Sequence, residues 1–172
     1  DMLEKQVKKT FLSLGSNLGD KKLNIEKAKF LLQEDKNFKI LQSSSFYKTK
    51  SWPNEKNPPF LNIAIECLTT FTPLSLFKFV KKIEKKLGRK KAQKNSPRVC
   101  DIDILDFDHK IIKIKNQNNL IYIPHNRLHE RDFVLLPLFE IAKNWIHPKK
   151  NKKISDLLIN INPDNLRTIK LV

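Results

Sequence analysis

Hydrophobic and polar positions alternate along this chain in two periods, that of strands and that of helices. Apolar residues in runs or at every second position predict strands over residues 10–14, 38–47, 60–69 and 101–107. Between them, a helical spacing of apolar residues predicts helices over 20–33 and 73–87, with Asp20 and Thr72 as N-caps. The segment 48–59 contains three prolines and is expected to be an exposed loop.

The two predicted helices should each bury one face. In the first helix the expected buried residues are Leu23, Ala28, Leu31 and Leu32. In the second they are Leu76, Phe77, Val80, Ile83 and Leu87, with Gly88 ending the helix.

The order strand, helix, strand, strand, helix, strand is that of a ferredoxin-like split βαβ sandwich (βαββαβ), an α+β fold. The apolar pattern adds a hairpin over 111–114 and 120–123, a helix over 132–142 and a C-terminal helical segment. We expect residues 10–172 to form a single domain and residues 1–9 to be an N-terminal extension.

Composition restricts the classes of protein further. Hydrophobic residues make up 40% of the chain, and no apolar run reaches the roughly 20 residues of a membrane span. The chain shows no secretory leader, and Cys67 and Cys100 lack the spacing of metal ligands or redox pairs, which predicts buried thiols in a reducing cytoplasm. The net charge of +16 favours a polyanionic ligand, such as a nucleotide or nucleic acid.

Two aspartates interrupt the apolar strand 101–107. Asp101 and Asp103 are two residues apart and therefore share one face, while Cys100, Ile102 and Ile104 share the other. Two carboxylates this close need a cation between them, and Mg²⁺ prefers carboxylate and phosphate oxygens. The alternatives are a pair of solvated aspartates, or a structural domain that binds metal without nucleotide.

A cluster of basic residues precedes this acidic strand, whereas most other lysines of the chain reflect a general compositional bias. The cluster consists of Arg89, Lys90, Lys91, Lys94 and Arg98. The phosphate-binding pattern of P-loop kinases is absent, because the chain contains only three glycines, Gly15, Gly19 and Gly88.

Several blocks, in this order along the chain, resemble the hydroxymethyl-dihydropterin pyrophosphokinase family of the folate pathway. They cover nearly all of residues 10–145. They are LGSNLGD at 14–20, SFYKT at 45–49, FLN at 60–62, IEKKLGR at 83–89, PR at 97–98 before DIDIL at 101–105, and IPH at 123–125 followed by RLHER at 127–131. A single short motif matches by chance often, but an ordered set does not.

The resemblance implies transfer of pyrophosphate from ATP to 6-hydroxymethyl-7,8-dihydropterin, giving AMP and the pterin diphosphate. By the same resemblance, Asp101 and Asp103 are the ligands of two Mg²⁺ ions. The implied catalytic residues are Arg89, Lys91, Arg98 and Arg131, and the implied ATP-binding residues are Glu84, Arg98, Ile104, His125 and Arg131. The implied pterin-binding residues are Gly15, Thr49, Trp52, Phe60, Asn62 and Phe133.

The implied partners are the small molecules ATP and hydroxymethyl-dihydropterin, without nucleic acid or membrane. The chain could also be one part of a fused folate-pathway enzyme. It departs from the family's usual residues at Lys50, Ser51, Ser96, Val99, Cys100, Asn126 and Asp132. The competing interpretation is a basic ferredoxin-like module that binds single-stranded RNA, but two strand aspartates would repel a phosphate backbone and no RNP1 pattern is present.

Overall fold

The computed structural model describes residues 6–51, 54–89 and 96–172, so Trp52 and Lys91 lie outside the described residues. Its main sheet is antiparallel in every pairing. Strand β1 (Lys8–Ser16) lies between β4 (Phe60–Thr69) and the edge strand β5 (Asp101–Phe107). The far edge of β4 pairs with β2 (Phe38–Ser43) and β3 (Tyr47–Thr49), and β3 pairs in turn with the short β8 (Lys170–Leu171).

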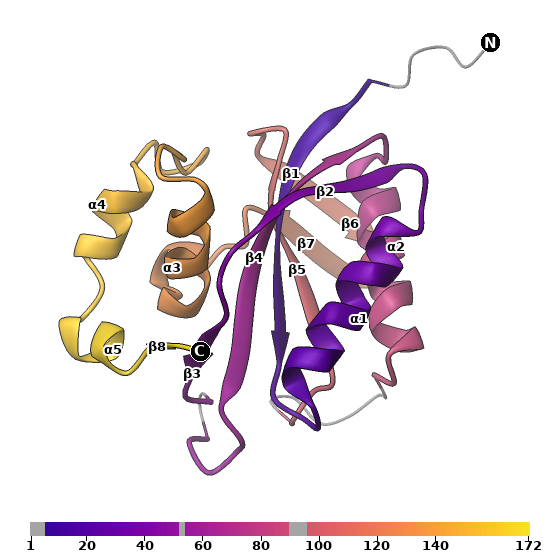
Figure 1. The fold of residues 1–172 in the computed structure, drawn as a ribbon. Coiled ribbons are helices and arrows are strands. Elements are labelled where there is room, and N and C mark those ends of the chain that lie inside the picture. The colour runs from indigo at the N-terminus through magenta and orange to yellow at the C-terminus, as the bar shows by residue number, and fades with distance from the viewer. Residues whose placement is uncertain (1–5, 52–53, 90–95) are drawn as a thin grey trace.

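Helices lie on both faces of this sheet (Figure 1). One face is covered by α1 (Lys21–Gln33) and α2 (Pro73–Lys86), and the β6–β7 hairpin lies beside them. The other face is covered by helices from the C-terminal third of the chain. The remaining elements are β6 (Ile112–Asn116), β7 (Asn119–Ile123), the 3₁₀ helix η1 (Leu128–Glu130), α3 (Asp132–Ile141), α4 (Ile154–Ile159) and α5 (Pro163–Arg167).

The predicted mixed architecture of helices on an antiparallel sheet is confirmed, as are the hairpin, the third helix and the helical C-terminal segment. The side chains of Asp20 and Thr72 accept hydrogen bonds as N-caps, and Gly88 has a φ of 100° after the end of α2. Strand β1 begins at Lys8, inside the segment expected to be an extension. None of the helices in the described ranges is long and apolar enough to cross a membrane.

The single strand predicted over 38–47 is wrong, because the structure divides it into β2 and β3. The pairing of β2 with β4 shifts register between Ile40 and Gln42. Ser44 lies between the end of β2 and the start of β3. Its N–H donates to the Ala64 carbonyl over 2.8 Å, and its Oγ accepts from the Ala64 N–H over 2.9 Å. The Ser44 hydroxyl thus replaces a strand carbonyl as the acceptor, and the chain bends without losing a buried hydrogen bond.

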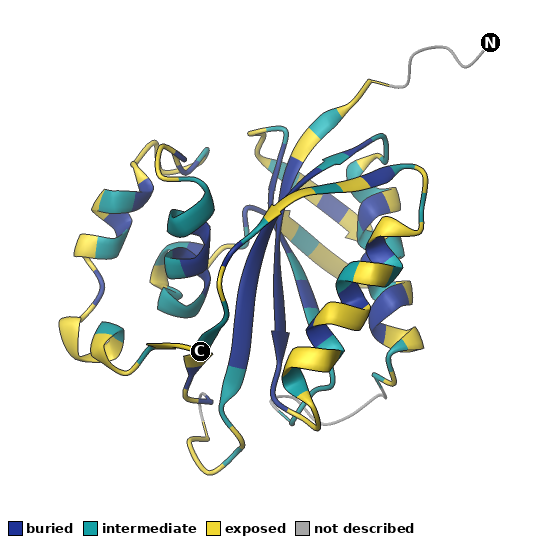
Figure 2. Ribbon diagram, viewed as in Figure 1, coloured by how far each residue is buried: buried dark blue, intermediate teal, exposed yellow. Residues whose placement is uncertain are grey.

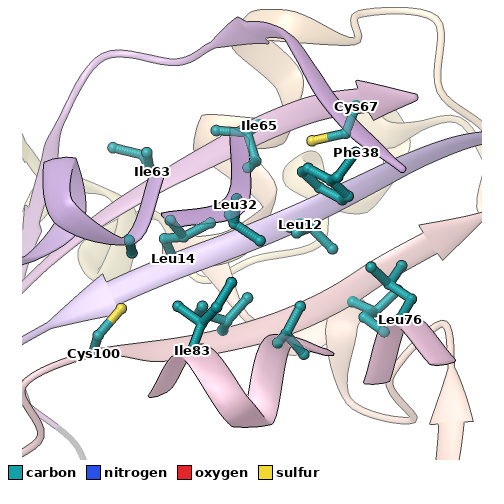
Figure 3. Packing of buried hydrophobic residues seen from close by; sticks show 14 of the residues in the cluster. Leu12, Leu14, Leu32, Phe38, Ile63, Ile65, Cys67, Leu76, Ile83 and Cys100 are labelled. Carbon is teal, nitrogen blue, oxygen red and sulfur yellow. The ribbon is translucent and has the colours of Figure 1, made fainter. Parts of the chain in front are cut away.

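The larger core lies between the sheet and helices α1 and α2 (Figure 3). Leu12 and Leu14 of β1 are fully buried there, and Cys67 and Cys100 are buried free thiols, as predicted. Helix α1 buries Ile25, Ala28 and Leu32 rather than Leu23, which is 47% exposed. The prediction for Leu23 was wrong because that residue is two positions before Ile25, which puts it about 200° round the helix from the buried face.

A second core lies on the opposite face, between the sheet and helices α3 and α4. Phe11 of β1, Ala64 of β4 and Leu105 of β5 contribute from the sheet. The indole N–H of Trp145 donates to the Oδ2 atom of buried Asp106 over 2.8 Å, which joins the C-terminal segment to β5. The central strands are therefore buried on both faces, as Figure 2 shows.

The second core should contribute substantially to stability. We expect Leu138→Ala, at a fully buried site on α3, to lower the free energy of unfolding by about 2 to 5 kcal/mol through lost burial and a cavity. The matched control is Ile159→Ala, because Ile159 is 77% exposed and should change the value by less than about 0.5 kcal/mol. Urea denaturation measures both, and equal effects would contradict a packed second core.

His147 should make this core sensitive to acid. Burial, with the nearby charges of His129 and Lys150, lowers the pKa of His147 to about 4, and its Nδ1 accepts the N–H groups of Lys149 and Lys150. Because the unfolded chain takes up the proton first, stability should be lost as pH falls from about 6.5 towards 4, by on the order of 3 kcal/mol. His147→Asn keeps an acceptor but does not titrate, so denaturation curves of the variant should lack this part of the loss; identical pH profiles would refute it.

Candidate active site

The two aspartates of β5 face away from the larger core, as predicted. Cys100, Ile102 and Ile104 point into the core beneath α1 and α2, whereas the side chains of Asp101 and Asp103 are 21% and 37% exposed. The alternation of the strand therefore anchors one face in apolar side chains and leaves two carboxylates at the surface of the other.

Arginines from three separate segments surround these carboxylates. The Nη1 atom of Arg98 lies 2.7 Å from Asp101 Oδ2, and the Nη1 atom of Arg89 lies 2.8 Å from Asp101 Oδ1. The Nη1 atom of Arg131 lies 3.6 Å from Asp103 Oδ2. Three of the four predicted catalytic residues are therefore brought to the acidic pair by the fold, and the fourth, Lys91, is outside the described residues.

The two carboxylates differ electrostatically. Burial disfavours ionisation of Asp101, but the charges of Arg98, Lys81 and Arg89 outweigh it and hold the pKa of Asp101 below its ordinary value. For Asp103, burial and the Asp101 charge raise the pKa, and Lys81 and Arg131 offset this only in part. Asp103 is thus the carboxylate that gains more from a cation placed beside the pair.

Glu84 links helix α2 to this strand. Its side chain is 1% exposed, and Oε1 accepts the Ile102 N–H over 2.7 Å and the Lys81 Nζ over 3.0 Å. Its other oxygen pairs with Arg89. Burial raises the pKa of Glu84. Glu84 thereby fixes the peptide between the two aspartates and orients Arg89, and the sequence had not indicated that Lys81 belongs to this network.

Asn17 is a second residue whose position sequence reasoning missed. Its Oδ1 accepts the Arg98 N–H over 2.7 Å, and its own N–H donates to the Arg98 carbonyl over 3.1 Å. Its Nδ2 donates to Ser51 Oγ and to the Pro58 carbonyl, each over 3.2 Å. Asn17 therefore holds together the Arg98 segment and the loop after β3. The signal was its place in the LGSNLGD block, in which Gly15 and Asp20 had been given roles but Asn17 had not.

A row across the sheet connects the acidic pair to the predicted pterin residues. Gly15 of β1 lies opposite Asp101 of β5 and opposite Asn62 of β4. A Cβ at Gly15 would be 2.6 Å from Asn62 Oδ1, so a side chain there would displace the amide. Asn62 Nδ2 donates to Thr49 Oγ1 over 3.0 Å, and Thr49 pairs in register with Phe60. The four residues form one polar and aromatic patch beside the carboxylates.

The remaining predicted residues lie at the start of α3 and in the segment before it. The Arg131 guanidinium lies 5.7 Å from the centre of the Phe133 ring, and its Nη2 is 3.5 Å from His125 Nε2. Burial and the Arg131 charge lower the pKa of His125, which keeps the imidazole neutral at pH 7. Arg131 therefore lies among Asp103, His125 and Phe133, where the predicted ATP and pterin groups meet.

A small cavity opens next to Asp103. It lies between α2, β5 and the β6–β7 hairpin, and its lining includes both Ile104 and His125. The other lining residues are Phe77, Val80, Lys81, Ile102, Ile121, Tyr122 and Ile123. An apolar wall with a few polar groups suits a flat, partly polar ring.

The donor set around the acidic pair fits magnesium. In the described part of the chain, no group of three or more His, Cys, Asp or Glu residues could hold a metal ion. Mg²⁺ is commonly held by one or two carboxylates, with phosphate oxygens and water as the other ligands, and Asp101 and Asp103 supply two carboxylates.

Comparison with known proteins identifies the family. Residues 11–143 match the family described as 7,8-dihydro-6-hydroxymethylpterin-pyrophosphokinase (HPPK). The 2-amino-4-hydroxy-6-hydroxymethyldihydropteridine pyrophosphokinase of Aquifex aeolicus is 39% identical over 146 residues, which is 85% of this chain and 88% of that protein. The folic acid synthesis protein FOL1 of Dictyostelium discoideum is 38% identical over 167 residues, 92% of this chain but only 23% of the relative.

The fold agrees with this match. A crystal structure of Plasmodium falciparum HPPK-DHPS, the A437G form with pteroate, superposes with a TM-score of 0.77 at 17% identity, covering 98% of this chain and 47% of that one. The chain thus spans most of the Aquifex relative and less than half of the two longer proteins. It belongs to the 7,8-dihydro-6-hydroxymethylpterin-pyrophosphokinase family.

Proposed function

We propose that this domain transfers the pyrophosphoryl group of ATP to 6-hydroxymethyl-7,8-dihydropterin in folate biosynthesis, with Mg²⁺ held by Asp101 and Asp103. The observation that carries the proposal is the convergence of Arg89, Arg98 and Arg131 on two carboxylates beside an amide and aromatic patch. Phosphoryl transfer requires alignment and neutralisation of charge more than covalent catalysis, and this arrangement supplies both.

The arginines are suited to the phosphates. A guanidinium offers a fixed pair of N–H donors that matches phosphate oxygens, and its charge persists at any physiological pH. In the free protein Arg89 and Arg98 are paired with Asp101, so each must exchange a carboxylate for a phosphate when ATP binds. We assign both residues, with Arg131, to the phosphates, and His125 as a neutral donor beside them.

The two Mg²⁺ ions of the proposal would be held by Asp101 and Asp103, together with triphosphate oxygens and water. When bound, they would neutralise charge on the transferred and leaving phosphates. The protein's own part is to hold both carboxylates on one rigid strand, which the Glu84 bond to the Ile102 N–H supports.

The chemical step follows from the stated products. The hydroxyl oxygen of the pterin forms a bond to the β-phosphorus, and the bond from that phosphorus to the oxygen bridging to the α-phosphorus breaks. The bridging oxygen leaves with AMP, and the hydroxyl proton is released. The patch of Gly15, Thr49, Asn62 and Phe60 would bind the pterin, with Phe133 as a stacking face and the Asn62 amide as the group that matches the hydrogen-bonding edge of the ring.

We also propose the finer classification and context. A ferredoxin-like assignment is supported because β4 lies between β1 and β2 and is antiparallel to both, with β5 on the other side of β1. Residues 10–172 would act as one pyrophosphokinase domain in the cytoplasm. A place in a longer folate enzyme is supported by the Dictyostelium relative, of which this chain matches only 23%.

The RNA-binding alternative has no support in these findings. The family match concerns a pterin enzyme, and the basic side chains that approach β5 are paired with Asp101, Asp103 and Glu84. A steep dependence of oligonucleotide binding on salt, without any need for Mg²⁺, would be required to revive it.

The decisive experiment is to incubate the protein with Mg²⁺, ATP and hydroxymethyl-dihydropterin and to measure AMP. AMP formed only in the presence of pterin supports the proposal, whereas ADP would indicate transfer of a single phosphate.

Asp101→Asn and Asp103→Asn should lower turnover by about 100-fold or more, because each loses a charged oxygen ligand. Asp164→Asn, at an exposed position on α5, is the matched control, and near-normal turnover of either strand variant would refute the metal role.

Gly15→Ala should separate pterin binding from nucleotide binding. The new methyl group would displace the Asn62 amide, since the two atoms would be 2.6 Å apart. Loss of a well-placed amide costs about 1 to 3 kcal/mol, so pterin affinity should fall by about 5- to 150-fold while the affinity for an ATP analogue stays within about threefold. Calorimetric titration measures both; unchanged pterin affinity in a folded variant would remove Gly15 and Asn62 from the pocket.

A further inference from the structure

Glu140, in the last turn of α3, joins this helix to β3 and to the residues just before that strand. The Ser45 N–H donates to Glu140 Oε2 over 2.6 Å, and the Tyr47 hydroxyl donates to Glu140 Oε1 over 2.8 Å. Beside them, Gln42 Nε2 donates to the Ile141 carbonyl oxygen over 2.9 Å. We call the contacts of Glu140 with Ser45 and Tyr47 the Glu140 clamp. It attaches the segment between β2 and β3 to one end of α3.

The two donors of the clamp remain available at physiological pH. Burial, the hydrogen bond to Glu140 and the charge of Glu140 raise the pKa of Tyr47 to about 12, so its hydroxyl keeps its proton. Although the chain has a net charge of +16, no ion pair of Glu140 occurs within residues 6–51, 54–89 and 96–172. Both carboxylate oxygens are therefore used by Ser45 and Tyr47, and hydrogen bonds to an ionised acceptor are stronger than those between neutral groups.

The clamped strand contains part of the proposed pterin patch. Tyr47 lies opposite Asn62 in the register of β3 and β4, and Thr49, two residues later, points to the same face. Asn62 Nδ2 donates to Thr49 Oγ1 over 3.0 Å. Ala64, two residues after Asn62, packs in the second core together with α3. The clamp and the Asn62 amide therefore lie on the face of the sheet that α3 covers.

The other end of α3 contains the proposed stacking residue, Phe133. Glu140 follows it by seven residues, which places the two roughly 10 Å apart along one short, stiff helix. Strand β3 has only three residues, and its outer neighbour β8 has two, so few backbone hydrogen bonds hold it. Fixing Glu140 to β3 therefore fixes the position of Phe133 relative to Thr49 and Asn62.

We propose that Glu140 is a positioning residue for the pterin pocket, which holds β3 against α3 and so keeps the Asn62 amide and the Phe133 ring at a fixed separation. This inference rests on the proposed function and adds a residue that touches neither substrate. A preformed pocket loses less conformational freedom when its ligand binds, so the clamp would strengthen pterin binding without a contact of its own.

Calorimetric titration with hydroxymethyl-dihydropterin and with a non-hydrolysable ATP analogue, both in the presence of Mg²⁺, tests this role. Glu140→Ala removes both acceptors, so pterin affinity should fall by about fivefold or more while the affinity for the ATP analogue stays within about threefold. Glu140→Gln should recover at least half of the logarithmic loss, because its carbonyl can accept the Ser45 N–H and its amide can donate to the Tyr47 hydroxyl oxygen.

A double-mutant cycle shows whether Glu140 and Tyr47 act as one unit. Tyr47→Phe should weaken pterin binding by about twofold or more in the unaltered background and have no further effect in Glu140→Ala. The matched control is Trp145→Phe, which removes the hydrogen bond to Asp106 on β5, a strand separated from β3 by β1 and β4. This control should lower the melting temperature but leave both affinities within about threefold.

Unchanged pterin affinity in a folded Glu140→Ala variant would overturn the proposal. An equal loss for both ligands, or the same selective loss in Trp145→Phe, would overturn it as well, because the clamp would then only stabilise the fold. Pterin-dependent AMP release by the unaltered protein is measured in parallel. Pterin binding without AMP release would refute the proposed reaction alone, and a selective loss in Glu140→Ala would still support the clamp. Absence of pterin binding by the unaltered protein would refute both.

Discussion

Pairing of three carboxylates, Glu84, Asp101 and Asp103, with arginine and lysine side chains at the start of β5 is the interaction on which the site depends. Glu84 is almost completely buried and would be costly to ionise alone, so the N–H of Ile102, Lys81 and Arg89 compensate it. Arg89 continues the network to Asp101, which Arg98 also holds. Because one network contains the helix, the strand and both arginines, the geometry of the candidate metal ligands is fixed before any substrate arrives.

In the free protein, the arginines of this network already neutralise the negative charge of Asp101. Both oxygens of Asp101 are occupied by guanidinium groups, so a metal ion alone must compete with two ion pairs. A triphosphate offers those guanidinium groups an alternative partner and simultaneously supplies further oxygens for the metal. In the proposed reaction, nucleotide and metal would therefore assist each other in binding.

Burial of the sheet on both faces explains why the site can be rigid and still accessible. Apolar side chains fill the space under α1 and α2 and, farther along the strands, the space under α3 and α4. The carboxylate row lies at the end of the strands where Gly15 has no side chain and where Asn62 and Thr49 replace apolar residues. The second core stops short of this row, and the polar patch is supported from the opposite face of the sheet by the larger core.

The sequence by itself determined the order of elements, the caps at Asp20 and Thr72, and the shared face of Asp101 and Asp103, because caps and strand alternation are local properties. Its ordered motifs also identified the family. Only the tertiary structure decided the break at Ser44, the exposure of Leu23, and the roles of Asn17 and Lys81. Each of these depends on a partner from a distant segment or on the direction in which a helix packs, and neither is encoded in the local period of a chain.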